Sequence, residues 1–240
     1  MPHYDNQEYV RIMRTLPKNI ETDIFSIPFI APDDINISNL NNGKWLIGIK
    51  NATANGNNAK NKIVHMFSHD SVLRPIYDNP YRLLSRVSRY YAVATPDFSM
   101  YKGMCFPDIL QAVYKNRWIG AFLQSNGKKV VATVGWIEKE YDYLTFAGLK
   151  DGSVFIISSL STRNNLSEYE FLRGYHEMRN RFPSSKIICV GLPWKGIDQD
   201  VCLISYKDSF GSRDKRCTYW QQKMYNWDMS VAEEVVGYGI

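Results

Sequence analysis

Residues 92–98 read AVATPDF, an apolar run that stops abruptly at polar residues. The same pattern recurs as VVATVGW at residues 130–136, VFIISSLST at residues 154–162 and IICVGLP at residues 187–193. Short, nearly continuous apolar runs are typical of strands that are buried on both faces, as they are in a parallel sheet. The recurrence predicts several parallel strands, and the polar residues after each run mark where we expect a binding site to begin.

Helical patterns separate these strands. The sequence predicts a helix over residues 80–90 and a longer one over residues 107–125. The clearest helix begins at Ser167, whose side chain can form a capping box with Glu170, and it ends before Pro183. Strands that alternate with helices imply parallel pairing with right-handed crossovers. We therefore expect an α/β fold of parallel βα units that is TIM-barrel-like, complete or incomplete; a doubly wound open sheet is the alternative.

The length of 240 residues fits one domain and is near the lower limit for eight full βα units. We expect a single α/β domain over residues 1–240. It would begin with an N-terminal segment over residues 1–43 and end in an aromatic, locally basic C-terminal appendage over residues 195–240. Residues 25–30 are predicted to form a short strand, and residues 201–205 a final one.

The composition is that of an ordinary globular protein, with 45% hydrophobic and 22% charged residues. Residues 1–22 carry charges among their apolar residues, which is unlike a signal peptide, and no stretch is long enough to span a membrane. We expect a cytoplasmic protein whose four cysteines are reduced, because they show no CxxC spacing. The 29 basic and 24 acidic residues give a net charge of +5, which permits contact with DNA or RNA but does not require it.

Polar residues at the carboxyl ends of the strands are the candidates for chemistry, because ligands bind at that edge in both folds. Asp97 follows one strand, where its carboxylate could act as a base, ligate a metal or accept a hydrogen bond from a ligand. Asp70 and His69 follow another predicted strand, at residues 63–67. We predict all three as catalytic residues and as ligands of a divalent metal ion, since carboxylate and imidazole groups suit such ions. The alternative is that Asp97 only caps the loop that follows it.

Five further residues at the strand ends are predicted to bind a ligand: Ser99, Trp136, Ser158, Ser159 and Thr162. The hydroxyl-rich run at residues 158–162 precedes a helix N-terminus, which suits an anion, but it lacks the glycines of a phosphate-cradling loop. The alternative is that this run forms only an ordinary turn and the N-cap of the helix. The sequence contains no GxSxG, Walker, GxGxxG or paired-cysteine zinc motif, so standard enzyme classes gain no support from motifs.

Two basic regions are candidates for contact with nucleic acid, because cations bind phosphates and neighbouring aromatic rings can stack on bases. The residues concerned are Arg82, Arg86 and Arg89 on one predicted helix, and Arg213, Lys215 and Arg216 near the C-terminus. The alternative for both regions is a solvated basic face.

Five motifs follow one another along the chain: TPDFSMY at residues 95–101, QSNG at residues 124–127, TVGW at residues 133–136, and ISSLST followed by GYHEM within residues 157–178. In this order the chain resembles an uncharacterised domain family of phages, plasmids and bacterial chromosomes, domain of unknown function 4417, over residues 25–193. The resemblance implies a mobile-element context and a single α/β domain. It brings no established activity.

Two classes of function follow from these observations. The first is a phage or mobile-element protein that binds or processes nucleic acid, with Asp97, Asp70 and His69 holding a divalent metal ion for phosphodiester chemistry. The alternative is a small-molecule or nucleotide-binding enzyme, or a counter-defence protein that sequesters a nucleotide signal at the strand ends. A steep loss of nucleic-acid affinity with salt would favour the first, and thermal stabilisation by a nucleotide would favour the second.

Overall fold

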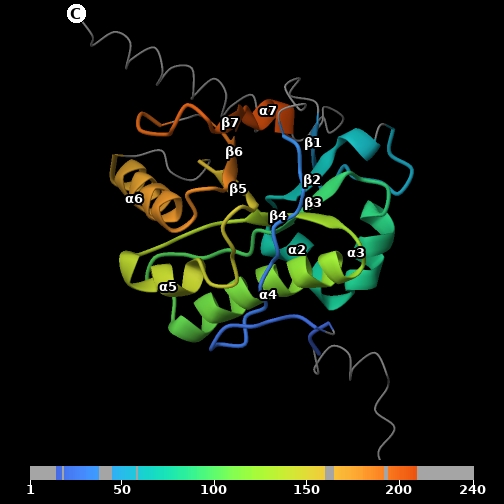
Figure 1. Ribbon diagram of the computed structural model, residues 1–240, viewed down its shortest axis with the longest axis horizontal. Coiled ribbons are helices and arrows are strands. Elements are labelled where there is room, and N and C mark those ends of the chain that lie inside the picture. The colour runs from blue at the N-terminus through green and yellow to red at the C-terminus, as the bar shows by residue number, and fades with distance from the viewer. Residues whose placement is uncertain are drawn as a thin grey trace, which may run out of the picture.

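A seven-stranded parallel sheet forms the centre of the molecule (Figure 1). The computed structural model describes residues 15–17, 19–37, 45–57, 59–159, 165–191 and 194–209. The strands lie side by side in the order in which they occur along the chain. They are β1 (Leu46–Gly48), β2 (Ile63–Met66), β3 (Ala92–Pro96), β4 (Lys129–Thr133), β5 (Val154–Ser158), β6 (Lys186–Val190) and β7 (Cys202–Ile204).

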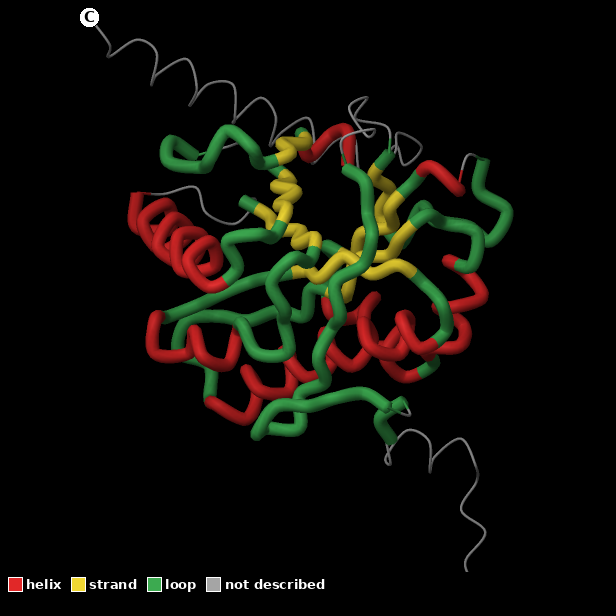
Figure 2. Tube along the Cα trace, viewed as in Figure 1, coloured by secondary structure: helices red, strands yellow, loops and turns green. Residues whose placement is uncertain are grey.

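The sheet curls into a half-barrel, as the strands in Figure 2 show. Every neighbouring pair is parallel. The strand order never reverses, whereas a doubly wound sheet needs such a reversal, so that alternative does not apply. The edges of the sheet are β1 and β7, and a short helix, α7 (Tyr206–Ser209), lies between them and contacts β1 (Figure 1). The predicted incomplete barrel is confirmed.

Helices connect the strands on the outer side of the curl (Figure 1). The longest, α4 (Phe106–Ser125), packs along β3 and β4. The connection from β4 to β5 contains only the short elements η3 (Lys139–Tyr141) and α5 (Asp142–Thr145), so the helical layer is thinner there. The helical elements are η2 (Ala59–Asn61), α2 (Asp70–Asp78), α3 (Pro80–Val87), α4 (Phe106–Ser125), η3 (Lys139–Tyr141), α5 (Asp142–Thr145), α6 (Asn165–Arg181) and α7.

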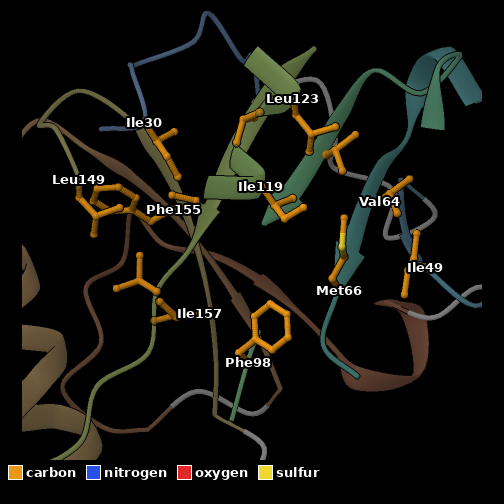
Figure 3. Packing of buried hydrophobic residues seen from close by; sticks show 14 of the residues in the cluster. Ile30, Ile49, Val64, Met66, Phe98, Ile119, Leu123, Leu149, Phe155 and Ile157 are labelled. Atoms are coloured by element: carbon orange, nitrogen blue, oxygen red, sulfur yellow. The ribbon is translucent and has the colours of Figure 1, made fainter. Parts of the chain in front are cut away.

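Alternating side chains of the strands form two apolar layers, because successive residues of a strand point to opposite faces. The outer layer packs strand residues such as Val64 and Phe155 against the helices, including Ile119 of α4 (Figure 3). The concave layer contains Ala92 and Ala94 among larger aliphatic side chains. Small residues there leave space for the sheet to curl.

The N-terminal segment crosses the amino-terminal ends of β3 and β4. The Asp33 carboxylate accepts a hydrogen bond from the first buried amide of β4, at Val130, at 2.8 Å. Asn36 N donates to the hydroxyl of Tyr91, just before β3, at 3.1 Å. The strand predicted over residues 25–30 is wrong: the described residues there form an isolated antiparallel bridge between Thr22 and Pro28. The Asp23 carboxylate accepts the nearby amides instead, which favours a tight turn over an extended strand.

Candidate functional site

Asp97 and Asp70 lie together at the carboxyl edge of β2 and β3. Asp97 directly follows the last residue of β3, and Asp70 is the first residue of α2, which begins shortly after β2. Ser99 joins the two segments, because its amide and its hydroxyl both donate to Oδ1 of Asp70, at 3.1 and 2.9 Å. The loop after β3 is therefore hydrogen-bonded to the start of α2. The two carboxyl groups are close enough for the charge of Asp70 to act on Asp97.

The Asp97 carboxyl is half-buried, and its surroundings disfavour the charged form. Burial, and then the negative charge of Asp70, raise the pKa of Asp97 to about 7. The amide and the hydroxyl of Ser99 both donate to the Asp70 carboxylate, and this favours the charged form of Asp70. Asp97 is therefore able to change its protonation state near neutral pH, as an acid, a base or a cation ligand must.

A small crevice opens beside Asp97, between the ends of β3 and β4, the middle of α4, and α5. Its volume of about 10 Å³ suits roughly one water molecule. The residues that line it are Asp97, Phe98, Met100, Ala112, Val113, Asn116, Arg117, Thr133, Gly135 and Thr145. A Cβ atom added at Gly135 would lie 4.0 Å from Oδ1 of Asp97, so this glycine keeps one side of the carboxyl open.

Two buried polar residues of α4 support this edge of the sheet. Asn116 donates from Nδ2 to the carbonyl oxygens of Pro96 and Thr133, at 2.8 and 3.1 Å, and so bridges the ends of β3 and β4. The Arg117 guanidinium donates to Asn116 Oδ1 and to carbonyl oxygens, including that of Thr145 at 2.8 Å. Burial lowers the pKa of Arg117 to about 9. Sequence reasoning missed this role, although two adjacent polar residues inside the apolar stretch of a long helix are a signal for it.

A lysine of α4 stands near the carboxyl pair on the outer side of the molecule. Lys115 Nζ lies 5.5 Å from the centre of the Phe98 ring and donates to Oε1 of Gln111 at 2.8 Å. Partial burial and the positive charge of Arg74 lower its pKa, whereas the charge of Asp70 acts in the opposite direction. Asp70 therefore has a cation close enough for the two charges to interact.

His69 does not complete a three-residue metal site with the two aspartates. It is exposed at the N-cap of α2, and its side chain makes no capping hydrogen bond. Across the described residues, no group of three or more His, Cys, Asp or Glu side chains is placed to hold a metal ion. The pair of Asp97 and Asp70 is what the structure assembles from the three predicted ligands.

The other predicted ligand-binding residues have different surroundings. Trp136 packs against α6: its Nε1 donates to the Glu170 carbonyl oxygen at 3.2 Å, and a Cβ atom at Gly174 would lie 2.1 Å from its ring. Ser159 is buried beside Gly191, and Ser158 is the half-buried last residue of β5. None of these three lines the crevice beside Asp97. Thr162 lies outside the described residues.

The three arginines predicted to contact nucleic acid from one helix have different surroundings. Arg86 donates from Nε to the Ala52 carbonyl oxygen at 2.7 Å and from Nη2 to that of Lys50 at 3.2 Å, so it fastens the loop after β1 to α3. Arg82 and Arg89 are exposed. The second predicted group, Arg213, Lys215 and Arg216, lies outside the described residues.

Comparison with known families identifies the domain. The profile of a domain of unknown function, DUF4417, matches residues 22–207. The chain belongs to this family. The DUF4417 match confirms the resemblance indicated by the motifs, and it extends past residue 193 to include β7 and nearly reaches the end of α7.

Two relatives of this DUF4417 chain are phage proteins. It is similar to the "Gene 1 protein" of Mycobacterium phage L5, with 33% identity over 129 residues, which cover 53% of this chain and 56% of that protein. The "Gene 1 protein" of Mycobacterium phage D29 is 31% identical over 129 residues, covering 53% of this chain and 48% of that protein. The matched region thus spans about half the length of these relatives. The protein is a member of a phage-associated family of unknown function.

No solved structure matches the chain. Among the helices that the structure describes, none is long and apolar enough to cross a membrane.

Proposed function

We propose that this protein binds and processes nucleic acid, and that Asp97 and Asp70 together hold a divalent metal ion for phosphodiester chemistry. The observation that carries the proposal is the pair itself: Asp70 is held by Ser99, and Asp97, at the end of β3, is close enough for its charge to interact with that of Asp70. Two neighbouring carboxylates repel each other when both are charged. A cation bound between them offsets this repulsion, because it attracts both.

The number of ligands favours Mg²⁺. This ion keeps several of its waters and is commonly bound by one or two carboxylates together with phosphates of the substrate, without a complete protein cage. A site of two aspartates and no third protein ligand among the described residues fits that pattern. When bound, such an ion stabilises negative charge on a phosphoryl oxygen and activates water.

The surrounding charges support a phosphate-containing substrate. Lys115 stands beside Asp70, close enough for their charges to interact, and can bind a phosphate oxygen. Arg82 and Arg89 are exposed, so their guanidinium groups are free to contact a longer backbone, as we propose also for Arg213, Lys215 and Arg216. Arg86 has neighbouring carbonyl groups as partners and contributes less.

The crevice favours a polymer over a sequestered nucleotide. Its volume of about 10 Å³ cannot enclose a base or a sugar, so a nucleotide would have to lie outside it, at the open edge of the sheet. A polymer bound across the surface needs only to place one phosphate near the two aspartates.

The test combines metal binding with nucleic-acid binding. Calorimetric titration with MgCl₂ or MnCl₂ should show binding to the wild type that Asp97→Asn abolishes. Asp108→Asn is the matched control, because Asp108 is an exposed carboxylate in the first turn of α4. Single-stranded DNA and RNA should bind with an affinity that falls steeply with salt, and should be cut only with the metal present. Equal behaviour of the wild type and Asp97→Asn in both assays would refute the proposal.

A further inference from the structure

We infer that the crevice beside Asp97 is a site for one tightly bound water molecule, which joins the Asp97 carboxyl to the Thr145 hydroxyl and to the Arg117 guanidinium. This inference goes beyond the proposed function, because a water site here requires neither a metal ion nor a nucleic acid.

The first observation concerns Thr145, which closes α5 and lines the crevice. None of its surface is exposed, and its Oγ1 has no hydrogen-bond partner among the described residues. Its carbonyl oxygen is already occupied by Nη2 of Arg117. Buried hydroxyl groups are nearly always hydrogen-bonded, and ordered water is the usual partner where protein groups provide none.

The second observation concerns Arg117. A guanidinium carries five N–H groups, and the four hydrogen bonds of Arg117 engage Nε, both hydrogens of Nη1 and one hydrogen of Nη2. One Nη2 hydrogen is left on a side chain that is buried and lines the crevice. The four acceptors are uncharged, so the positive charge has no carboxylate partner within the described part of the chain. A water molecule can accept the remaining hydrogen.

The third observation is the fit of size and polarity. A volume of about 10 Å³ is enough for one water and too small for a phosphate. A water there would accept from Arg117 Nη2, exchange a hydrogen bond with Thr145 Oγ1 and donate to the Asp97 carboxyl. Three partners are typical for a buried water.

The test uses the sign of a stability change. Thr145→Val keeps the side-chain shape and removes the hydroxyl. If the hydroxyl binds a water, the variant loses a hydrogen-bonded partner and its Tm falls by several degrees. Ser153→Ala is the matched control, because the Ser153 hydroxyl is also buried without a partner but does not line the crevice. Its Tm should stay unchanged or rise.

A Tm of Thr145→Val that is unchanged or raised, as in the control, would overturn the inference. Water–protein cross-relaxation by NMR on the wild type provides a second measurement that does not depend on a variant. A long-lived water signal at the Thr145 methyl group is expected, and its absence would contradict the site. Both experiments are made without metal or nucleic acid, so their failure would leave the proposed function standing.

Discussion

Replacing Asp97 by asparagine should make the protein less sensitive to alkaline pH. Burial and the charge of Asp70 raise the pKa of Asp97 from its ordinary 3.8 to about 7. The folded protein then holds this proton more tightly than the unfolded chain does. The stabilisation is fully present below pH 3.8 and is lost as the pH rises through 7. Asparagine has no charge to bury, so Asp97→Asn lacks this loss.

The size of the effect follows from the difference in pKa. Between pH 5 and pH 8 the shift corresponds to at most about 3 kcal/mol of unfolding free energy, because each pKa unit corresponds to about 1.4 kcal/mol. Since Asp97 is only half-buried and solvent screens its charge, we expect about 1–2 kcal/mol.

Urea unfolding followed by tryptophan fluorescence measures this quantity. The stability of Asp97→Asn relative to the wild type should increase by that amount from pH 5 to pH 8, whereas Asp108→Asn should show no such change. A relative stability that is the same at both pH values, or that decreases towards pH 8, would refute the reasoning about the Asp97 environment.

Two further variants test other parts of the structure. Burial lowers the pKa of His65 to about 4, so the wild type should lose about 2 kcal/mol relative to His65→Gln as the pH falls from 7 to 5. His176→Gln, which replaces an exposed histidine, is the control, and equal pH dependence in the two variants would contradict the expectation. Gly174→Ala should lower the unfolding free energy by about 1–3 kcal/mol in denaturant unfolding, because its Cβ would lie 2.1 Å from the Trp136 ring. Gly135→Ala, whose new contacts are ordinary, should unfold like the wild type, and a similar cost at both glycines would refute the packing argument.

The strands were predictable because each is a short apolar run with a sharp end. The run at residues 92–98 gave β3 and placed Asp97 at its carboxyl edge, where the structure confirms its position. Helix α2 was missed, since Pro75 lies within it and proline is unfavourable inside helices. The closure of the half-barrel by α7 depends on contacts between distant segments, which no local pattern records.

The candidate site was predictable only in part. The rule that ligands bind at the carboxyl edge identified Asp97 and Asp70 as neighbours, but it did not predict that Ser99 would bind Asp70. The contributions of Asn116 and Arg117 depend on how α4 lies across the sheet, and that of Thr145 depends on a four-residue helix. Helical periodicity could not expose these residues, because the second half of α4 is buried nearly all round.

The central claim is that Asp97 and Asp70 hold one divalent cation between them. The most direct measurement is anomalous diffraction from crystals soaked in MnCl₂, which locates Mn²⁺ without assuming its ligands. The account predicts an anomalous peak within roughly 2.0–2.3 Å of a carboxylate oxygen of each aspartate, a distance typical of small divalent cations. Crystals that diffract well and show no peak between these two carboxyl groups would contradict it.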